Sequence, residues 1–382
     1  MKITFLFIAF FLLLKVNAQE FSYDWHTTGD ITYYIDETEV VDTVVYSIIT
    51  AYQPFDADPT AGVDMIVPDS TNGTSGYPNL IVLSKMSTNG TYLGSTLLMQ
   101  HYSSGDINIR DMKISQDGRI VISGRTQNPG INFTPFISNT SLYSATMGYN
   151  NRTTFIAFYD LNGSYQNHIE YGDGQAVFIN ELDIDDNNNL YCTGSFSQNV
   201  DFDFTSGTDS FTANRGSGMI IKINLNTQSY VWTKAIYGNS SYQYASVGFV
   251  YTEIKNNKIY ISGYASELDS VDTDPSSAAH WEVNGNFNTN NQEMTFIVKL
   301  DINGNFINSF SYSGTTDYAD PAGIAVDQQD NVYVTGYYYS YDTLHLGQGA
   351  SAPLLYTSLY DGSNYEALVC LFKLDNNFNV VW

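Results

Sequence analysis

The sequence predicts an all-β protein, and three observations carry that prediction. Residues suited to strands are abundant, with Tyr 31 and Phe 22, while charged residues make up only 14% of the chain. Apolar residues alternate with polar ones over short runs, as in Ile259, Ile261 and Val332, Val334, which is the period of a half-buried strand. Asp-Gly, Asn-Asn and Asn-Gly pairs separate these runs and indicate turns.

One ten-residue phrase recurs along the chain. It places a polar turn before alternating apolar residues and closes on Gly, at Gly124, Gly194, Gly263 and Gly336; the copies read SQDGRIVISG, DDNNNLYCTG, IKNNKIYISG and DQQDNVYVTG. A degenerate copy, VVYSIITA, ends at Ala51. Recurrence at a nearly fixed period is the signature of a repeat architecture.

A second phrase recurs in step with the first. It consists of an apolar strand, an Asn-rich turn and the start of another strand, as in FIVKLDINGNFIN and LFKLDNNFNVVW. Together the phrases divide the chain into five units, at 25–94, 95–167, 168–232, 233–308 and 309–382. Each unit predicts four antiparallel strands, which is the content of a propeller blade.

The predicted architecture of residues 19–382 is therefore a β-propeller built from about five visible four-stranded blades. The alternative is an open row of β units or a sandwich. Radial packing is favoured because packing one small sheet on the next covers its apolar face. A complete five-unit ring and part of a larger, truncated ring both fit the repeat. The units exceed the usual blade of about 40 to 50 residues, so long loops are expected on one face.

The first eighteen residues have the pattern of a secretory signal peptide. Lys2 precedes an apolar run from Ile3 to Leu14, and Val16-Asn17-Ala18 resembles a cleavage site. The run is short for a bilayer span, which needs about 20 residues. We therefore expect a chain that is cleaved near Ala18, secreted or held at the bacterial cell surface, and without a transmembrane segment.

Charge and cysteine content narrow the classes of partner. The net charge of −25 argues against nucleic acid and anionic membranes, which both need cationic surfaces. It is compatible with bound cations. Cys192 and Cys370 lie in apolar runs and are expected to be buried thiols rather than part of a disulfide framework.

Pairs of aspartates follow the Gly-ending phrase in three units, at Asp56 and Asp58, Asp201 and Asp203, and Asp272 and Asp274. Alternating carboxylates in an extended loop present oxygen donors on one side, which suits Ca²⁺. The alternative is that each Asp side chain accepts hydrogen bonds from its own turn. Ca²⁺ is therefore the only cofactor that the sequence indicates, and a purely structural turn is the alternative interpretation of these aspartates.

Two further patterns carry alternatives. Lys85, Lys222, Lys299 and Lys373 share one position of the last strand, and we expect each to lie on its sheet beside a carboxylate. Tyr337, Tyr338 and Tyr339 form an aromatic run that could bind a sugar by ring stacking and hydroxyl hydrogen bonds, or could pack between blades.

Signals of catalysis are poor. The five histidines lack zinc-binding spacing, and no nucleophile elbow or phosphate-binding loop occurs in the sequence. A pair of carboxylates assembled from different blades, as in glycoside hydrolysis, stays open.

The unit DPAGIAVDQQDNVYVTGYYYSYDTLHL, with ALVCLFKLDNNFNVVW, resembles the bacterial seven-bladed β-propeller repeat family. GSFSQNVDFDFTSG is similar to that family's variant with an Asp-Phe-Asp-Pro-Gly signature. The resemblance covers residues 25 to 382 and rests on five in-phase copies, where the family name implies seven. It implies exported, surface or adhesion-type proteins and specifies no reaction.

The function expected from these features is a non-catalytic recognition or scaffold module that binds an extracellular glycan or protein at the cell surface. One alternative is a hydrolase or lyase acting on extracellular polysaccharide, with acids gathered around the propeller axis. Another is a purely structural repeat of a longer adhesin.

Overall fold

The computed structural model describes residues 33–69, 79–101, 107–127, 131–135, 152–171, 176–239, 246–266, 270–283, 293–314, 319–339, 343–347, 354–356 and 367–382. All regular elements in these ranges are β-strands, which confirms the all-β prediction. The same ranges contain no helix that is long and apolar enough to cross a membrane.

The long strands form five antiparallel groups in chain order. The first group is β1 (Tyr33–Val41), β2 (Val44–Ala51), β5 (Leu80–Ser87) and β6 (Tyr92–His101); the second is β7 (Ile107–Ile114), β8 (Arg119–Gln127), β10 (Arg152–Asp160) and β11 (Tyr165–Tyr171); the third is β12 (Ala176–Ile184), β13 (Asn189–Asp201), β14 (Ser210–Asn224) and β15 (Ser229–Asn239); the fourth is β16 (Ser246–Lys255), β17 (Lys258–Ser266), β20 (Glu293–Asp301) and β21 (Phe306–Gly314); the fifth is β22 (Ala319–Val326), β23 (Val332–Tyr339) and β26 (Ala367–Leu374).

The fifth group also carries the beginning of a fourth strand. The backbone N–H of Lys373 donates to the carbonyl oxygen of Trp382 at 2.9 Å, and the N–H of Val381 donates to the carbonyl oxygen of Lys373 at 2.8 Å. In the third group, Lys222 pairs with Trp232 in the corresponding place. The four predicted unit ends at residues 94, 167, 232 and 308 lie within the outer strands β6, β11, β15 and β21.

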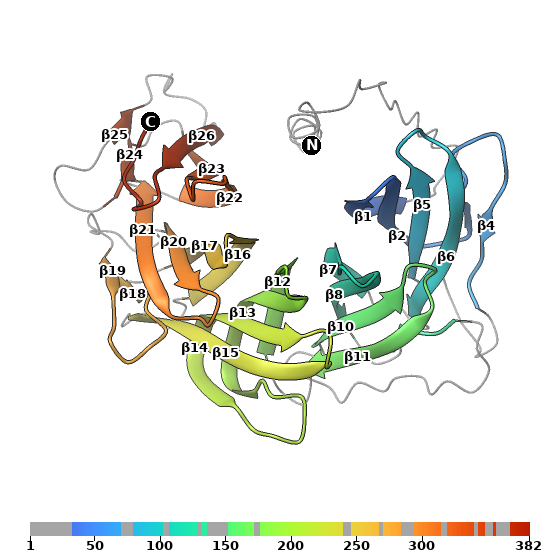
Figure 1. Cartoon of the computed structure of the whole chain (residues 1–382), viewed down its shortest axis with the longest axis horizontal. Coiled ribbons are helices and arrows are strands. Elements are labelled where there is room, and N and C mark those ends of the chain that lie inside the picture. Colours follow the sequence, from blue (N-terminus) through green and yellow to red (C-terminus); the bar gives the residue numbers. More distant parts are fainter. Residues whose placement is uncertain are drawn as a thin grey trace.

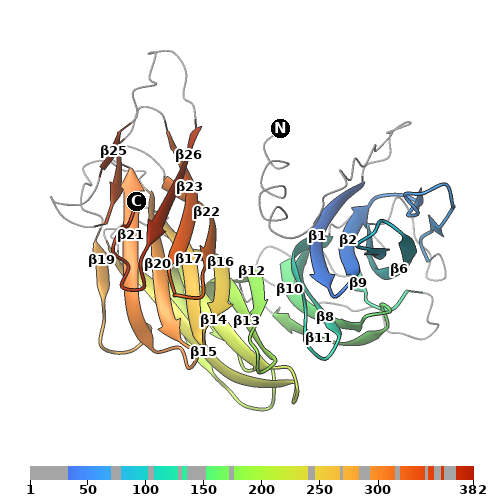
Figure 2. The ribbon, with the colours of Figure 1, turned by 45° about the horizontal axis from the view of Figure 1, so that its top comes forward.

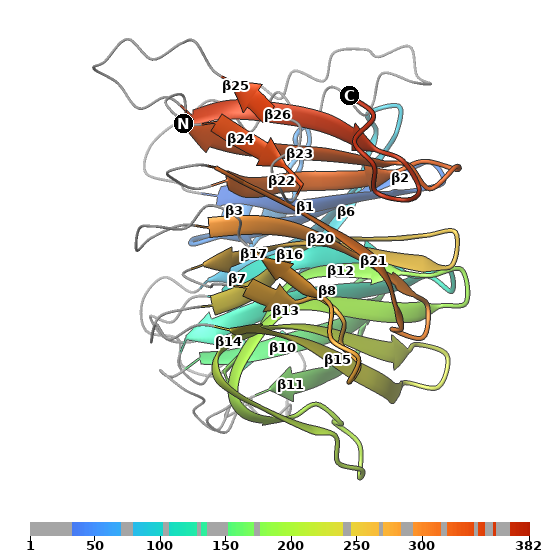
Figure 3. The same cartoon turned by 90° about the vertical axis from the view of Figure 1, so that its left-hand side faces the viewer.

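The five groups lie side by side along an arc, with the first and the fifth at its two ends (Figures 1 and 2). The inner strands β1, β7, β12, β16 and β22 follow the inside of this arc (Figure 1). Edge pairings join the third and fourth groups into one strongly curled twelve-stranded sheet. Seen from the side, the strands of the fourth and fifth groups run next to one another (Figure 3). Because the described groups follow an arc with the first and fifth at its two ends, a complete propeller stays a prediction.

Turn geometry explains the polar half of the repeated phrase. In the third group the Oδ1 atom of Asp185 accepts hydrogen bonds from the backbone N–H groups of Asn187 and Asn189, each at 2.9 Å. Asn188 has a φ of 60°, and Gly118 in the second group has a φ of 77° at the same place. Such left-handed residues suit Gly and Asn, so the phrase specifies a tight hairpin turn between the first two strands of a group.

The Gly that closes the phrase lies opposite a β-bulge. The register between β12 and β13 shifts between Ile179 and Glu181, where β12 faces Gly194. A Cβ atom on Gly194 would lie 1.8 Å from the carbonyl oxygen of Phe178. The inner strands of the other four groups have a register shift at the corresponding place. The bulge adds a residue to the inner strand and thereby re-aims the side chains that follow it.

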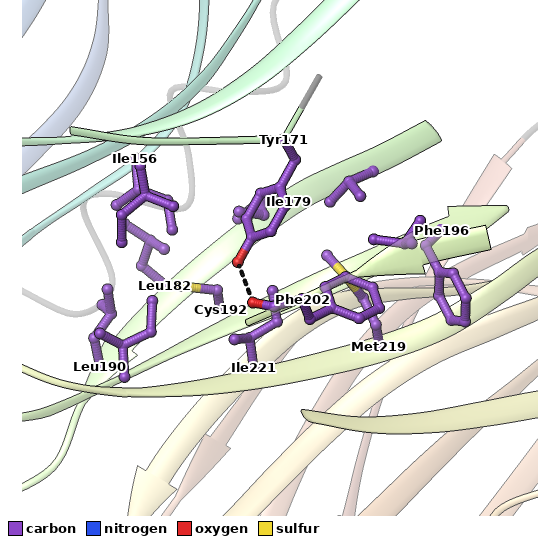
Figure 4. Packing of buried hydrophobic residues seen from close by; sticks show 14 of the residues in the cluster. Ile156, Tyr171, Ile179, Leu182, Leu190, Cys192, Phe196, Phe202, Met219 and Ile221 are labelled. Carbon is purple, nitrogen blue, oxygen red and sulfur yellow. Dashed lines mark hydrogen bonds between the residues drawn. The ribbon is translucent and has the colours of Figure 1, made fainter. Parts of the chain in front are cut away.

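Apolar side chains fill the space between neighbouring groups. Figure 4 shows the cluster between the second and third groups, in which Ile156 of β10 lies near Leu182, Leu190 and Cys192 of the third group. Here the hydroxyl of Tyr171 donates to the carbonyl oxygen of Phe202 at 3.2 Å. Similar clusters join the first group to the second, the third to the fourth and the fourth to the fifth. Cys192 and Cys370 are both buried free thiols, as the sequence predicts.

Short strands from the long loops connect the outer edges of neighbouring groups. β9 (Ile131–Asn132), from the second group's loop, pairs with β6 of the first group. β18 (Ser270–Asp272) pairs with β15 of the third group, and β24 (Thr343–Leu346) pairs with β21 of the fourth. β19 (Trp281–Val283) and β25 (Leu354–Tyr356) complete these two hairpins. In the first group, β3 (Phe55–Asp56) pairs with β4 (Met65–Ile66).

Two of the lysines that share one strand position donate hydrogen bonds to the next group. The Nζ atom of Lys222 donates to the carbonyl oxygen of Ile302 at 3.1 Å, and Nζ of Lys299 donates to the carbonyl oxygen of Asn376 at 2.6 Å. Both acceptors are in turns of the next group. The ammonium groups also lie over aromatic rings, so these cations join neighbouring groups.

Candidate functional site

The five inner strands bring together a set of charged side chains that lie far apart in the sequence. The residue directly after each bulge is Glu37, Asp111, Glu181, Tyr251 and Gly323 in the five groups, in order. Two residues further along, on the same side of each strand, are Glu39, Lys113, Asp183, Glu253 and Ala325. We call these ten positions the axial positions, because they follow the inside of the arc.

Axial carboxylates hold three of the inner strands, β7, β12 and β16, to the next one. The Oδ2 atom of Asp111 accepts a hydrogen bond from the backbone N–H of Leu182 at 2.6 Å. In the same way Asp183 accepts from the N–H of Ile254 at 2.6 Å, and Glu253 accepts from the N–H of Val326 at 2.7 Å. Backbone donors on the inner edge, which lack a further strand to pair with, are thereby satisfied.

Burial perturbs these acids strongly. It raises the pKa of Glu181 to about 9, with the charge of Asp111 adding to the effect. It raises the pKa of Glu253 and of Glu37 to about 7, and that of Asp111 to about 6. Burial disfavours the ionised form, and neighbouring like charges disfavour it further. At neutral pH some of the axial acids therefore carry a proton.

Lys113 is the one axial cation. Its Nζ atom lies 3.2 Å from Oε1 of Glu39 and 3.4 Å from Oδ1 of Asp111. Burial opposes its charge, but the carboxylates of Asp111, Glu39 and Asp183 together raise the pKa of Lys113 above its ordinary value. A single ammonium group therefore faces several carboxylates, so the cluster keeps an excess of acid.

A cavity of about 390 Å³ opens onto this cluster. Its lining residues are the acids Glu39, Asp183 and Glu253, together with Lys113, Thr252, Ile114, Ile184 and Ile324. All five inner strands contribute. A cationic group entering the cavity would favour the ionised carboxylates and release protons.

The predicted aspartate pairs lie elsewhere, on three separate peripheral hairpins. The first acid of each pair uses one oxygen to accept two backbone N–H groups: Asp201 Oδ1 accepts from Asp203 at 3.2 Å and from Asp209 at 2.9 Å. The corresponding bonds at Asp56 are 3.1 and 2.8 Å, and those at Asp272 are 3.2 and 2.7 Å. The structure does not bring the three pairs together.

The second acid of each pair completes the same turn. Asp203 Oδ1 accepts from the backbone N–H of Thr205 at 2.9 Å and from its hydroxyl at 2.6 Å. Asp58 and Asp274 likewise accept from the backbone N–H of the residue two places later. In the described ranges, no group of three or more His, Cys, Asp or Glu side chains is placed to hold a metal ion. Turn stabilisation accounts for these contacts, and the calcium interpretation stays a prediction.

The tyrosine run does not present one continuous face. Tyr337 is about half-exposed on β23, whereas Tyr338 is buried in the cluster between the fourth and fifth groups. Tyr339 ends the strand, and its side chain lies outside the described residues. Alternation along a strand sends neighbouring side chains to opposite faces, so Tyr337 and Tyr338 do not share one binding surface.

The axial cluster was not predicted residue by residue. The acids occupy positions just before the repeated phrase, but their types change from group to group, and the bulge shifts their register.

A scan against protein-family models and a search of characterised proteins found no match to this chain.

Proposed function

We propose that the chain is an exported β-propeller of the bacterial seven-bladed repeat type that acts as a non-catalytic recognition module at the cell surface. The arc of four-stranded meanders, with apolar clusters between neighbours, supports the propeller. The N-terminal pattern of residues 1–18 supports export.

The ligand of this module binds at the axial cavity through a cationic group. The observation that carries this proposal is the cavity wall, where Glu39, Asp183 and Glu253 come from three different inner strands and face only one lysine among the described lining residues. Ligand sites form where a scaffold gathers convergent polar groups in a concave, partly apolar surface. The partner is an extracellular protein or glycan with a basic side chain or an amino sugar.

Binding calorimetry with two matched sugar probes tests the proposal. Chitosan hexamer carries amines, while the fully N-acetylated hexamer has the same backbone without charge. We expect the chitosan probe to bind at least tenfold more tightly and a lysine-rich octapeptide to compete with it. Glu253→Gln and Asp183→Asn should each weaken binding about tenfold, which corresponds to 1.4 kcal/mol. Asp186→Asn, in an exposed turn, removes the same charge away from the cavity and serves as the control.

Failure of both cationic probes to bind would refute the axial site and favour the structural-repeat interpretation. Equal weakening by Asp186→Asn and Glu253→Gln would show that net charge alone attracts the probe. Binding that survives both cavity changes but is lost in Tyr337→Ala would move the site to β23.

One observation favours a second candidate, a hydrolase or lyase acting on extracellular polysaccharide. Burial raises the pKa of Glu253 to about 7, so at neutral pH it can donate a proton within the cavity that also holds the carboxylates of Asp183 and Glu39. Turnover of acidic or neutral polysaccharides that disappears in Glu253→Gln would support this candidate. Tight probe binding without turnover would support recognition.

A further inference from the structure

The backbone N–H groups on the inner edge of the arc follow a regular pattern. Next to the axial positions each inner strand pairs on one side only, so every second N–H points to the inside of the arc, away from its ladder partner. Such donors need an acceptor where they are shielded from water. In four inner strands these donors belong to the residue directly after each axial position: Met112 and Ile114 in β7, Leu182 and Ile184 in β12, Thr252 and Ile254 in β16, and Ile324 and Val326 in β22.

Carboxylates serve as acceptors for six of these eight donors. Acids of the preceding group accept from Leu182, Thr252, Ile254 and Val326, and acids of the same strand accept from Met112 and Ile184. In the described part of the chain, the N–H groups of Ile114 and Ile324 have no acceptor. The pattern is therefore interrupted at two places.

Residue types at the axial positions explain both interruptions. By register, the acid that would accept from β7 is Glu39, which contacts Nζ of Lys113 at 3.2 Å instead. The position that would serve β22 holds Tyr251, whereas the third group has Glu181 there and uses it as an acceptor. Each interruption thus has a cause in the chain itself.

Both donors line the axial cavity, on opposite sides of its acids. Ile114 is on β7 and Ile324 is on β22. Asp183 on β12 and Glu253 on β16 lie between these strands along the arc (Figure 1). Ile324 is two residues, or about 7 Å, from Val326, whose N–H donates to Glu253 at 2.7 Å. The cavity therefore offers carboxylates to a cation and an uncharged N–H donor on either side of them.

We propose that the axial cavity selects an amino sugar, in which uncharged hydroxyl or ether oxygens flank the ammonium group. This selectivity rests on the proposed function, because it concerns the ligand of the same site. The ammonium contacts Asp183 and Glu253, and oxygens of the sugar accept from the N–H groups of Ile114 and Ile324.

Other cations satisfy the cavity less completely. A lysine side chain has only methylene groups beside its ammonium, so it would leave both donors of the cavity without an acceptor. A free amino acid has acceptor oxygens beside its ammonium, but they belong to a carboxylate, which the acids of the cavity would repel. A hexosamine combines the cation with neutral acceptors.

Binding calorimetry with two probes of equal charge tests this proposal. Chitosan trimer and spermidine each have three amines, and only the sugar has oxygens beside them; both are compared at one pH at which these amines are protonated. We expect chitosan trimer to bind at least tenfold more tightly than spermidine. Similar affinities would overturn the selectivity while leaving the cation site of the proposed function in place, whereas failure of both probes to bind would refute the site itself.

Tyr251→Gln tests the assigned donor on β22. Gln has the length of the glutamate at the corresponding position 181, so its amide oxygen should accept from the N–H of Ile324 without adding charge. We expect this change to lower the affinity for chitosan trimer at least threefold and to leave that for spermidine unchanged. Tyr251→Leu removes the same phenol without supplying an acceptor. An equal effect of the two changes, or no effect of either, would overturn the assignment.

A proline at position 324 provides a second measurement. Ile324→Pro removes the N–H itself, at a place where it is not part of the ladder, and such edge positions tolerate proline. We expect the affinity for chitosan trimer to fall as in Tyr251→Gln, and an unchanged affinity in the folded variant would contradict the proposal. Circular dichroism and thermal melts check that each variant folds.

Discussion

Oδ2 of Asp111, on the inner strand of the second group, accepts the backbone N–H of Leu182 on the inner strand of the third, at 2.6 Å. The same carboxylate uses Oδ1 to contact Nζ of Lys113 at 3.4 Å. One buried acid thus joins two strand groups and balances the only axial cation.

Replacing Asp111 should therefore destabilise the fold. In Asp111→Ala the N–H of Leu182 loses its acceptor and Lys113 loses a partner, so we expect the free energy of unfolding to fall by about 3 kcal/mol. Asp111→Asn keeps an oxygen acceptor and should lose less. Urea denaturation measures both changes, and equal losses in the two variants would contradict the role of the hydrogen bond.

The closing glycine of the repeated phrase is required by the bulge opposite it. A Cβ atom at position 194 would lie 1.8 Å from a backbone oxygen, whereas one at Gly323 would meet only the hydroxyl oxygen of Thr335 at 3.1 Å. We expect Gly194→Ala to lower the free energy of unfolding by about 3 kcal/mol or to prevent folding, and Gly323→Ala to lower it by about 1 kcal/mol or less. Urea denaturation of both variants measures the difference, and similar stabilities would show that the bulge relaxes freely.

The axial acids should make stability fall as pH rises. A glutamate in the unfolded chain has a pKa of about 4.3, whereas burial raises the pKa of folded Glu181 to about 9. Between these values the folded state binds more protons than the unfolded state, so raising the pH lowers the free energy of unfolding. This stabilisation is fully present below about pH 4.3 and is lost as the pH rises through about 9.

Thermal melts from pH 5 to pH 9 at constant ionic strength test this linkage. The Tm of the wild type should fall over that range, and Glu181→Gln should flatten the fall because it removes the largest contributor. Asp186→Asn, in its exposed turn, should keep the wild-type slope. A Tm that rises with pH would contradict the buried acid cluster.

The peripheral aspartates can be tested as turn acceptors against calcium ligands. Because Asp201 Oδ1 accepts two backbone N–H groups, Asp201→Ala should lower the free energy of unfolding by about 1 to 2 kcal/mol, while Asp201→Asn should be tolerated. We expect a chelator to leave the Tm unchanged. A Tm that falls on chelation and recovers with added Ca²⁺ would support the calcium interpretation instead.

Much of the fold follows from local patterns in the sequence. Alternation at Ile259 and Ile261 predicts a strand, and β17 contains both residues. The polar residues from Asp185 to Asn189 predict a turn, and their side chains stabilise one. These features are local, because each depends on residues within a few positions of one another.

The axial site depends on packing between groups and could not be found in the same way. Glu39, Asp183 and Glu253 share no motif, and they converge only because bulges in separate inner strands re-aim them. For Tyr337, Tyr338 and Tyr339 the sequence left open sugar binding or packing between blades, and the side chain of Tyr338 packs in the core between the fourth and fifth groups. The sequence did not show which member of the aromatic run faces the interior.

The short strands that cross to a neighbouring group have a consequence for how the molecule unfolds. β18 is in the fourth group's loop, yet it pairs with β15 of the third, and β24 of the fifth group's loop pairs with β21 of the fourth. A group cannot detach without also breaking backbone hydrogen bonds of its neighbour. Nearest-neighbour coupling of this strength favours one cooperative transition over a series of separate steps. Slow amide exchange should therefore extend across several groups with one common opening free energy.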